Sequence, residues 1–157
     1  MIGTTQDLTG AQSVLQALTH LGAQPLTEPT LDDGQLAALY ESVCQDIEAG
    51  RFADALDDAF VLVANDPWER AFLLALAWCL HHLGQWESAG GFYSVALMLD
   101  ATDALCAFRI GECLVAMGEA VQAREAFEAA ITLSALDERY APVCQEARQA
   151  LLALAQA

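Results

Sequence analysis

The sequence contains no lysine, and all six of its basic residues are arginine. Against 22 acidic residues they leave a formal net charge of −16. Such a charge repels phosphate backbones and anionic lipid surfaces, so nucleic acid and membrane surfaces are excluded as natural partners. Eleven of the acids lie between Glu28 and Glu69, where Arg51 is the only base. This cluster is either a solvated surface or a field that attracts a basic client.

Long apolar runs and paired cysteines are also missing. The longest apolar run, Ala71 to Leu80, has ten residues, about half of what a membrane-spanning helix needs. The first ten residues lack the basic region and the apolar stretch of a signal peptide. The five cysteines form no Cys-x-x-Cys pair, which favours buried thiols in a reducing compartment. We therefore expect a cytoplasmic protein that does not insert into a membrane.

Motifs for catalysis, metals and cofactors are absent as well. A phosphate-binding loop that ends in Gly-Lys is impossible without lysine, and no Gly-x-Gly-x-x-Gly occurs. His81 and His82 have no third ligand at the spacing of a metal site, so we interpret them as groove or surface histidines. No carboxylate stands in a local pattern with Ser, His or Cys. We expect no enzyme activity, no metal and no cofactor.

What the sequence does contain is a repeat of 34 residues. Gly50, Gly84 and Gly118 recur at that spacing. Five residues after each glycine stands an alanine, and four residues further on stand Ala59, Tyr93 and Phe127. Thirty-four residues is the period of tetratricopeptide repeats, which are pairs of antiparallel helices. A glycine ends the first helix where the backbone turns left-handed, and the small alanine lets the two helices approach closely.

Leucine and alanine dominate an apolar fraction of 55%, which favours helices throughout. We therefore predict an all-α fold of three tetratricopeptide hairpins, stacked in a right-handed superhelix and capped at both ends, because a single hairpin cannot bury its apolar face. In the first copy Ala59 replaces the aromatic and Val43 replaces a usually small residue, so we expect that copy to be the least regular. The expected boundaries are residues 1–35 for an N-terminal helix and linker, 36–69, 70–103 and 104–135 for the repeats, and 136–157 for a capping helix.

Both flanking segments have helical patterns. From about Thr9 to Leu21, apolar residues recur at helical spacing, and Gly22 and Pro25 end the segment. At the other end Pro142 suits the first turn of a helix that runs to about Ala155, with Val143, Ala147, Leu151 and Leu154 on one face.

The first helix of each repeat is expected to line the concave side of the stack. The positions that face this side are predicted to form an apolar, aromatic-bearing groove: Ala37, Tyr40, Cys44, Ile47, Ala71, Leu74, Trp78, His81, Leu105, Phe108, Glu112 and Val115, with Glu41, Glu48 and Arg109 at its edge. An exposed patch of aromatic side chains indicates a binding surface. The alternative is that these aromatics belong to the core, covered by the C-terminal helix.

Three runs of sequence resemble one particular family of tetratricopeptide proteins. These are Leu39 to Ala55, Phe72 to Cys79 followed by Leu83-Gly84-Gln85-Trp86, and Gly111-Glu112-Cys113-Leu114 followed by Gly118-Glu119. They are similar to the class II translocator chaperones of type III secretion systems, of the LcrH/SycD type. The resemblance extends from about residue 16 to 135. The family often has aromatic residues where Cys44 and Ile47 stand here.

The resemblance implies an ATP-independent chaperone that binds hydrophobic translocator proteins and keeps them soluble before export. In this family a short extended client segment of the Pro-x-Leu-x-x-Pro kind lies in the concave groove, which implies client contacts for Tyr40, Ile47, Trp78 and Phe108. The N-terminal helix commonly mediates homodimers, which implies an interface at Val14, Leu15, Leu18 and Leu21. The alternative function is a general tetratricopeptide adaptor or regulator that binds a different protein.

Overall fold

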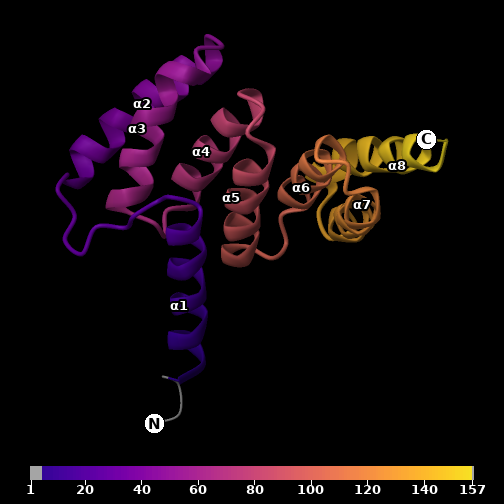
Figure 1. Cartoon of the computed structure of the whole chain (residues 1–157), viewed down its shortest axis with the longest axis horizontal. Coiled ribbons are helices and arrows are strands. Elements are labelled where there is room, and N and C mark those ends of the chain that lie inside the picture. The colour runs from indigo at the N-terminus through magenta and orange to yellow at the C-terminus, as the bar shows by residue number, and fades with distance from the viewer. Residues whose placement is uncertain (1–4, 157) are drawn as a thin grey trace.

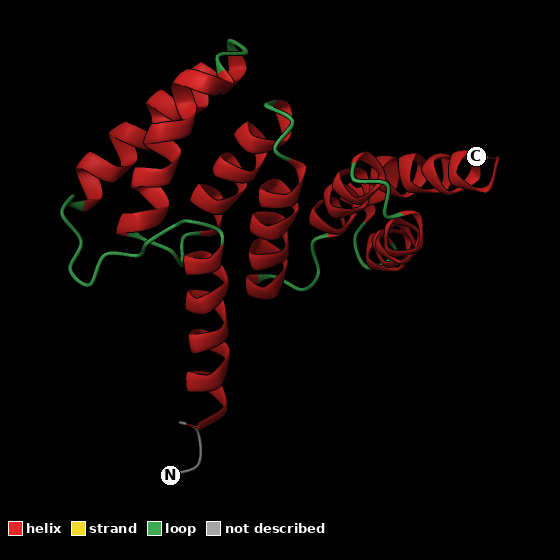
Figure 2. Ribbon diagram, viewed as in Figure 1, coloured by secondary structure: helices red, strands yellow, loops and turns green. Residues whose placement is uncertain are grey.

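The computed structural model describes residues 5–156, with side chains from residue 11 onward, and in this range it contains helices and no strand. The all-α prediction is therefore confirmed. Figures 1 and 2 show the helices side by side along the long axis of the molecule. In chain order they are α1 (Thr5–His20), α2 (Asp33–Glu48), α3 (Phe52–Asn65), α4 (Arg70–His82), α5 (Trp86–Leu99), α6 (Ala104–Ala116), α7 (Ala120–Ser134), the short 3₁₀ helix η1 (Glu138–Tyr140) and α8 (Ala141–Gln156).

Three of the helix pairs form hairpins with nearly identical turns. Gly50, Gly84 and Gly118 follow α2, α4 and α6 with φ of 73°, 73° and 81°, as the repeat predicts. In the first hairpin the Arg51 amide donates to the Asp46 carbonyl at 2.8 Å, and the other two turns repeat this bond. It is the hydrogen bond of a Schellman motif, which satisfies a carbonyl at the end of the first helix. Gly22, with φ of 85°, ends α1 in the same way.

Two buried polar side chains hold the segments that connect the hairpins. Asn65 ends α3, and its Oδ1 accepts hydrogen bonds from the amides of Thr30 (2.8 Å) and Leu31 (3.0 Å), so it holds the linker before α2. Asp103 precedes α6 and accepts from the amides of Leu105 and Cys106 at 2.8 and 3.1 Å. Its other oxygen pairs with the guanidinium of Arg70, the first residue of α4. The repeats are therefore joined by polar contacts as well as by apolar packing.

The N-terminal helix docks on the second hairpin through its C-terminal half. Leu21 lies where any side chain at Gly91 of α5 would be, so this glycine makes room for it. Val14 and Leu18 are buried inside the chain, with exposed fractions of 4% and 0%. Figure 1 shows the remainder of α1 extending away from the body. Since Val14 and Leu18 face their own chain, the expectation that they form a dimer interface needs correction, and Leu15, exposed at 36%, is the one of the four that faces solvent.

The C-terminal helix α8 packs on α7 and on α6. Ala147 is fully buried there, and Val143, Leu151 and Leu154 pack around it, so the face predicted for this helix is the one that it buries. These side chains share a core with Phe108 and Phe127, separate from the core formed by α1 to α5. The chain thus has two apolar cores, and α6 contributes to both.

Candidate functional site

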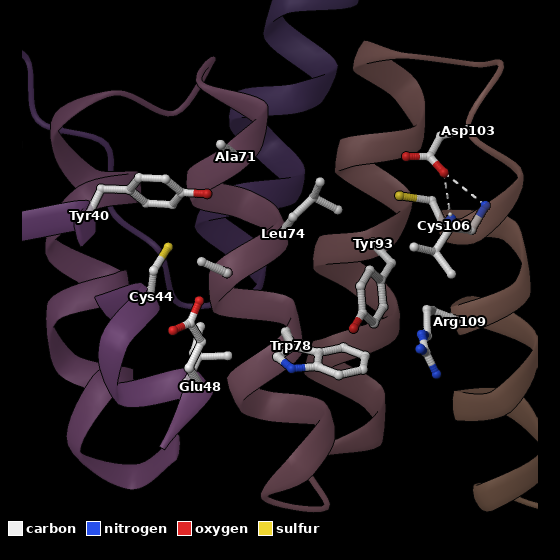
Figure 3. A pocket seen from close by; sticks show the side chains of 13 residues that line it. Tyr40, Cys44, Glu48, Ala71, Leu74, Trp78, Tyr93, Asp103, Cys106 and Arg109 are labelled. Atoms are coloured by element: carbon white, nitrogen blue, oxygen red, sulfur yellow. Dashed lines mark hydrogen bonds between the residues drawn. The ribbon is translucent and has the colours of Figure 1, made fainter. Parts of the chain in front are cut away.

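An apolar groove of about 360 Å³ crosses the concave side of the stack. Figure 3 shows its walls, which come from α2, α4, α5 and α6. In α2 and α4 the lining side chains recur three or four residues apart, so each helix presents a single face to the groove. The structure brings together eight of the residues predicted from the sequence, namely Tyr40, Cys44, Ile47, Ala71, Leu74, Trp78, Leu105 and Arg109.

Sequence reasoning missed part of the lining. Glu48, like Arg109, was expected at the edge of the groove and is part of its lining, whereas Tyr93 was not expected there. Tyr93 comes from α5, a second helix, and its ring reaches the groove between α4 and α6 (Figure 3). No residue pattern within a first helix could have indicated it. The missed lining residues are Ala75, Tyr93, Asp103 and Cys106.

Phe108 is the main correction to the predicted groove. Its side chain is buried, at 5% exposed, and its ring lies 5.5 Å from that of Phe127, so it belongs to the core beneath α8. For this residue the alternative, a core aromatic covered by the C-terminal helix, is right. Val115 is exposed, at 44%, but does not line the groove, and neither Ala37 nor Glu41 does.

His81 and Glu112 lie outside the groove lining, in a polar cluster with Arg109. Arg109 Nη1 donates to Glu112 Oε2 at 2.6 Å, and His81 Nε2 is 3.9 Å from the same oxygen. The Arg109 guanidinium carbon lies 4.5 Å from the centre of the Trp78 ring, a cation–π contact. The cluster therefore fixes both Trp78 and Arg109, which do line the groove.

Burial favours the neutral forms of one histidine and two tyrosines in this region. Burial lowers the pKa of His81, although the negative charge of Glu112 acts to raise it. The imidazole is therefore neutral near pH 7. Burial and a hydrogen bond with Cys44 raise the pKa of Tyr40 to about 12. The pKa of Tyr93 is raised further, also by burial. A groove with neutral phenols and an internally paired arginine suits an apolar ligand with few polar groups.

The described residues offer no other chemistry at this site. Among them no group of three or more His, Cys, Asp or Glu side chains is placed to hold a metal ion. The thiols of Cys79 and Cys113 have pKa values raised to about 11 by burial, so they are poor nucleophiles. In the same part of the chain, no helix is long and apolar enough to cross a membrane. The geometry of the groove is suited to binding a ligand.

Comparison with solved structures identifies the fold. PcrH of Pseudomonas aeruginosa, in complex with the chaperone-binding region of PopD, superposes with a TM-score of 0.77 at 25% identity, over 82% of this chain and 96% of that one. The chain shares its fold with the type III secretion translocator chaperones. A type III secretion complex from Aeromonas hydrophila gives a TM-score of 0.77 at 26% identity, over 92% of this chain and 96% of that one. The translocator chaperone SycD of Yersinia enterocolitica gives 0.75 at 24% identity, over 80% and 87%.

Sequence comparison finds the same chaperones. The low calcium response locus protein H of Yersinia pestis is 28% identical over 88 residues, which are 56% of this chain and 52% of that protein. The match therefore spans about half the length of this curated relative. No family model matches the chain. The resemblance to the LcrH/SycD type, predicted from the Gly111-Glu112-Cys113-Leu114 run and its neighbours, is confirmed by these findings.

Proposed function

We propose that this protein is an ATP-independent cytoplasmic chaperone that holds hydrophobic type III secretion translocators through a short extended segment. The observation that carries the proposal is the apolar groove across α2, α4 and α6, in a fold that PcrH uses with the chaperone-binding regions of PopD and PopB. The same fold occurs in SycD in complex with a peptide of the translocator YopD. The protein acts by binding and has no catalytic function.

The size of the groove supports an extended client. A volume of about 360 Å³ is at the small end for ligand pockets, which run from about 300 to 1,000 Å³. It accepts a few anchoring side chains but not a whole amphipathic helix. Burying one large aliphatic side chain contributes about 1.5–3 kcal/mol. A few anchors therefore give an affinity that keeps the client soluble by mass action and still lets it leave at export.

Affinity capture from the source bacterium tests the proposal. The groove variant carries Leu74→Ala and Trp78→Ala, since Phe108 lies in the core and its removal would unfold the protein. The control is Met98→Ala, a side chain exposed at 54% on α5 and outside the groove. We expect the wild type and the control to retain one or two large proteins with predicted membrane-spanning segments, and the groove variant to lose them.

A second experiment measures directly whether this protein keeps a translocator soluble. Each recovered translocator is co-expressed with either form, and its soluble fraction is compared. Soluble client with the wild type and aggregated client with the groove variant support the chaperone. Equal solubility with both forms, or capture of soluble folded partners alone, would contradict the proposal and favour an adaptor.

A further inference from the structure

Two polar atoms in the groove wall have no hydrogen-bond partner. Among the described residues, Tyr93 Oη and Arg109 Nε are the two buried side-chain nitrogen or oxygen atoms left unpaired. Tyr93 is 97% buried, with an exposed fraction of 3%. A buried polar group without a partner costs about 1–3 kcal/mol, so native proteins rarely keep one. Two such atoms at one place indicate a site that awaits a ligand.

Both atoms lie on the same stretch of the wall. Tyr93 projects from α5 and Arg109 from α6, both on the same side of the Trp78 ring, and both residues line the groove (Figure 3). Arg109 is held there because its Nη1 bonds Glu112 at 2.6 Å and its guanidinium stacks over Trp78. Among its N–H groups, the Nε–H is the one that is both buried and without a partner.

The chemistry of the pair selects a hydrogen-bond acceptor. Arg109 Nε can only donate, and a neutral phenol donates well because burial keeps its proton in place. A carboxylate is a poor candidate, since Glu112 already neutralises Arg109, and Glu48 and Asp103 also line the groove. A neutral oxygen fits better. An extended segment carries one at every residue, its main-chain carbonyl.

We propose that Tyr93 Oη and Arg109 Nε form a polar subsite that receives a main-chain carbonyl of the extended client segment. The inference rests on the proposed function and deepens it. Apolar anchors alone allow the segment to slide along the groove, whereas one carbonyl held at a fixed point sets its register. Since both atoms are covered in the free protein, the carbonyl reaches them when the Trp78 ring shifts while Arg109 stays bonded to Glu112, and such side-chain changes are common on binding.

Removing one hydroxyl tests the subsite. The probes are overlapping 15-residue fluorescent peptides that cover the translocator recovered by affinity capture, measured by fluorescence anisotropy. We expect Tyr93→Phe to weaken the best peptide about 5- to 10-fold, the effect of one lost hydrogen bond. The matched control is Tyr140→Phe, which removes the same atom from η1, outside the groove, and should leave the affinity unchanged. Arg109→Lys, which keeps the charge and removes Nε, should weaken binding as well.

Two further measurements distinguish recognition from general damage. The free Tyr93→Phe protein should have a Tm equal to or above that of the wild type, because the variant removes an unpaired buried hydroxyl. Replacing the amides of the best peptide by esters, one at a time, weakens each carbonyl as an acceptor. One position should lose affinity in the wild type and lose clearly less in Tyr93→Phe, where Arg109 Nε alone holds the carbonyl.

The outcomes separate this inference from the function on which it rests. If no peptide binds the wild type, the proposed function fails, and the subsite fails with it. If peptides bind the wild type and Tyr93→Phe equally well, the function stands and the subsite is wrong. A clear fall in the Tm of free Tyr93→Phe would also overturn the inference, because the hydroxyl would then have a partner within the protein.

Discussion

At the scale of single residues, the hairpins are built from complementary pairs of side chains. In the third hairpin, a Cβ at Gly111 would lie 2.5–2.9 Å from three ring carbons of Phe127, so the glycine makes room for the ring. The equivalent positions hold Ala77 and Tyr93 in the second hairpin, and Val43 and Ala59 in the first. In the first hairpin the sizes are reversed, with the larger residue on the first helix and the smaller one on the second. Val43 and Ala59, both fully buried, therefore compensate each other, and the first repeat is not irregular at this contact.

This packing predicts the effect of one added methyl group. Gly111→Ala should lower the free energy of unfolding by about 1–3 kcal/mol, because overpacking moves the Phe127 ring. Urea unfolding followed by circular dichroism measures the change. The control is Gly90→Ala in α5, whose added Cβ would meet Cys113 Cβ at 3.4 Å, an ordinary contact. That variant should be neutral or stabilising, because alanine favours a helix more than glycine does. Similar losses for both variants would contradict the complementary pairing.

Another residue-scale prediction concerns pH. The pKa of His81 is lowered in the folded protein, first by burial, whereas unfolded histidine titrates near 6.5. The unfolded state therefore binds more protons, so the contribution of His81 to stability is full above about pH 6.5 and is lost as pH falls through the folded pKa. Urea unfolding at pH 8.0 and 5.5 should show this loss in the wild type. His81→Asn should reduce it, whereas His20→Asn, an exposed change in α1, should not.

At the scale of elements, the start of α6 depends on Asp103. This side chain caps the helix and also holds Arg70 of α4, so it sets the spacing of the two helices that face each other across the groove. The amides of Leu105 and Cys106 donate hydrogen bonds to Asp103, and both residues are part of the groove lining. The sequence could predict the helix start. It could not predict the ion pair, because Arg70 and Asp103 are far apart in the chain.

Two variants separate the role of Asp103 as the cap of α6 from its role in the ion pair with Arg70. Asp103→Ala removes the cap and leaves a half-buried arginine unpaired, and should cost about 2–4 kcal/mol of unfolding free energy. Asp103→Asn keeps a capping oxygen and loses only the ion pair, so it should cost less. Urea unfolding of both variants measures the difference. If Asp103→Asn were as destabilising as Asp103→Ala, the cap would contribute nothing.

The elements also show what the sequence could and could not predict about the groove. Leu74 and Trp78 were predicted correctly because α4 has neighbouring hairpins on both sides, as the repeat assumes. Phe108 occupies the position equivalent to Leu74, but α8 follows the third hairpin and covers its aromatic side chain in the terminal core. In α6 the groove face consequently runs through Leu105, Cys106 and Arg109. A strict repeat register cannot anticipate a partner that is not itself a repeat.

At the scale of the whole molecule, the dimer expected from the resemblance has little apolar surface to use on α1 from residue 11 onward, where the side chains are described. Val14 and Leu18 are buried within the chain. The outward face between residues 12 and 20 combines Leu15 with polar side chains, namely Gln12, Ser13, Gln16, Thr19 and His20. A homodimer through this face alone should therefore be weak, because burying one leucine contributes only about 1.5–3 kcal/mol.

Two substitutions distinguish a residue at a dimer interface from a residue that packs α1 against its own chain. Leu15→Glu should shift any dimer toward monomer in light scattering and leave the unfolding midpoint of the monomer nearly unchanged. Leu18→Ala should instead lower the stability by about 2–5 kcal/mol, because it opens a cavity in the core. A dimer that survives Leu15→Glu would place the interface elsewhere than on this face of α1.

The division of the apolar interior has a consequence for the complex. The core of α1 to α5 and the core of α6 to α8 meet at α6, and the groove crosses from α2 to α6, the helix that contributes to both cores. Neighbouring units of a stacked repeat protein are coupled only through their shared interface. A client that touches α2, α4 and α6 at once therefore adds contacts between the two parts of the molecule and limits their motion relative to each other. In the proposed function, a bound client therefore makes the protein more rigid, and release of the client restores the motion of the two parts relative to each other.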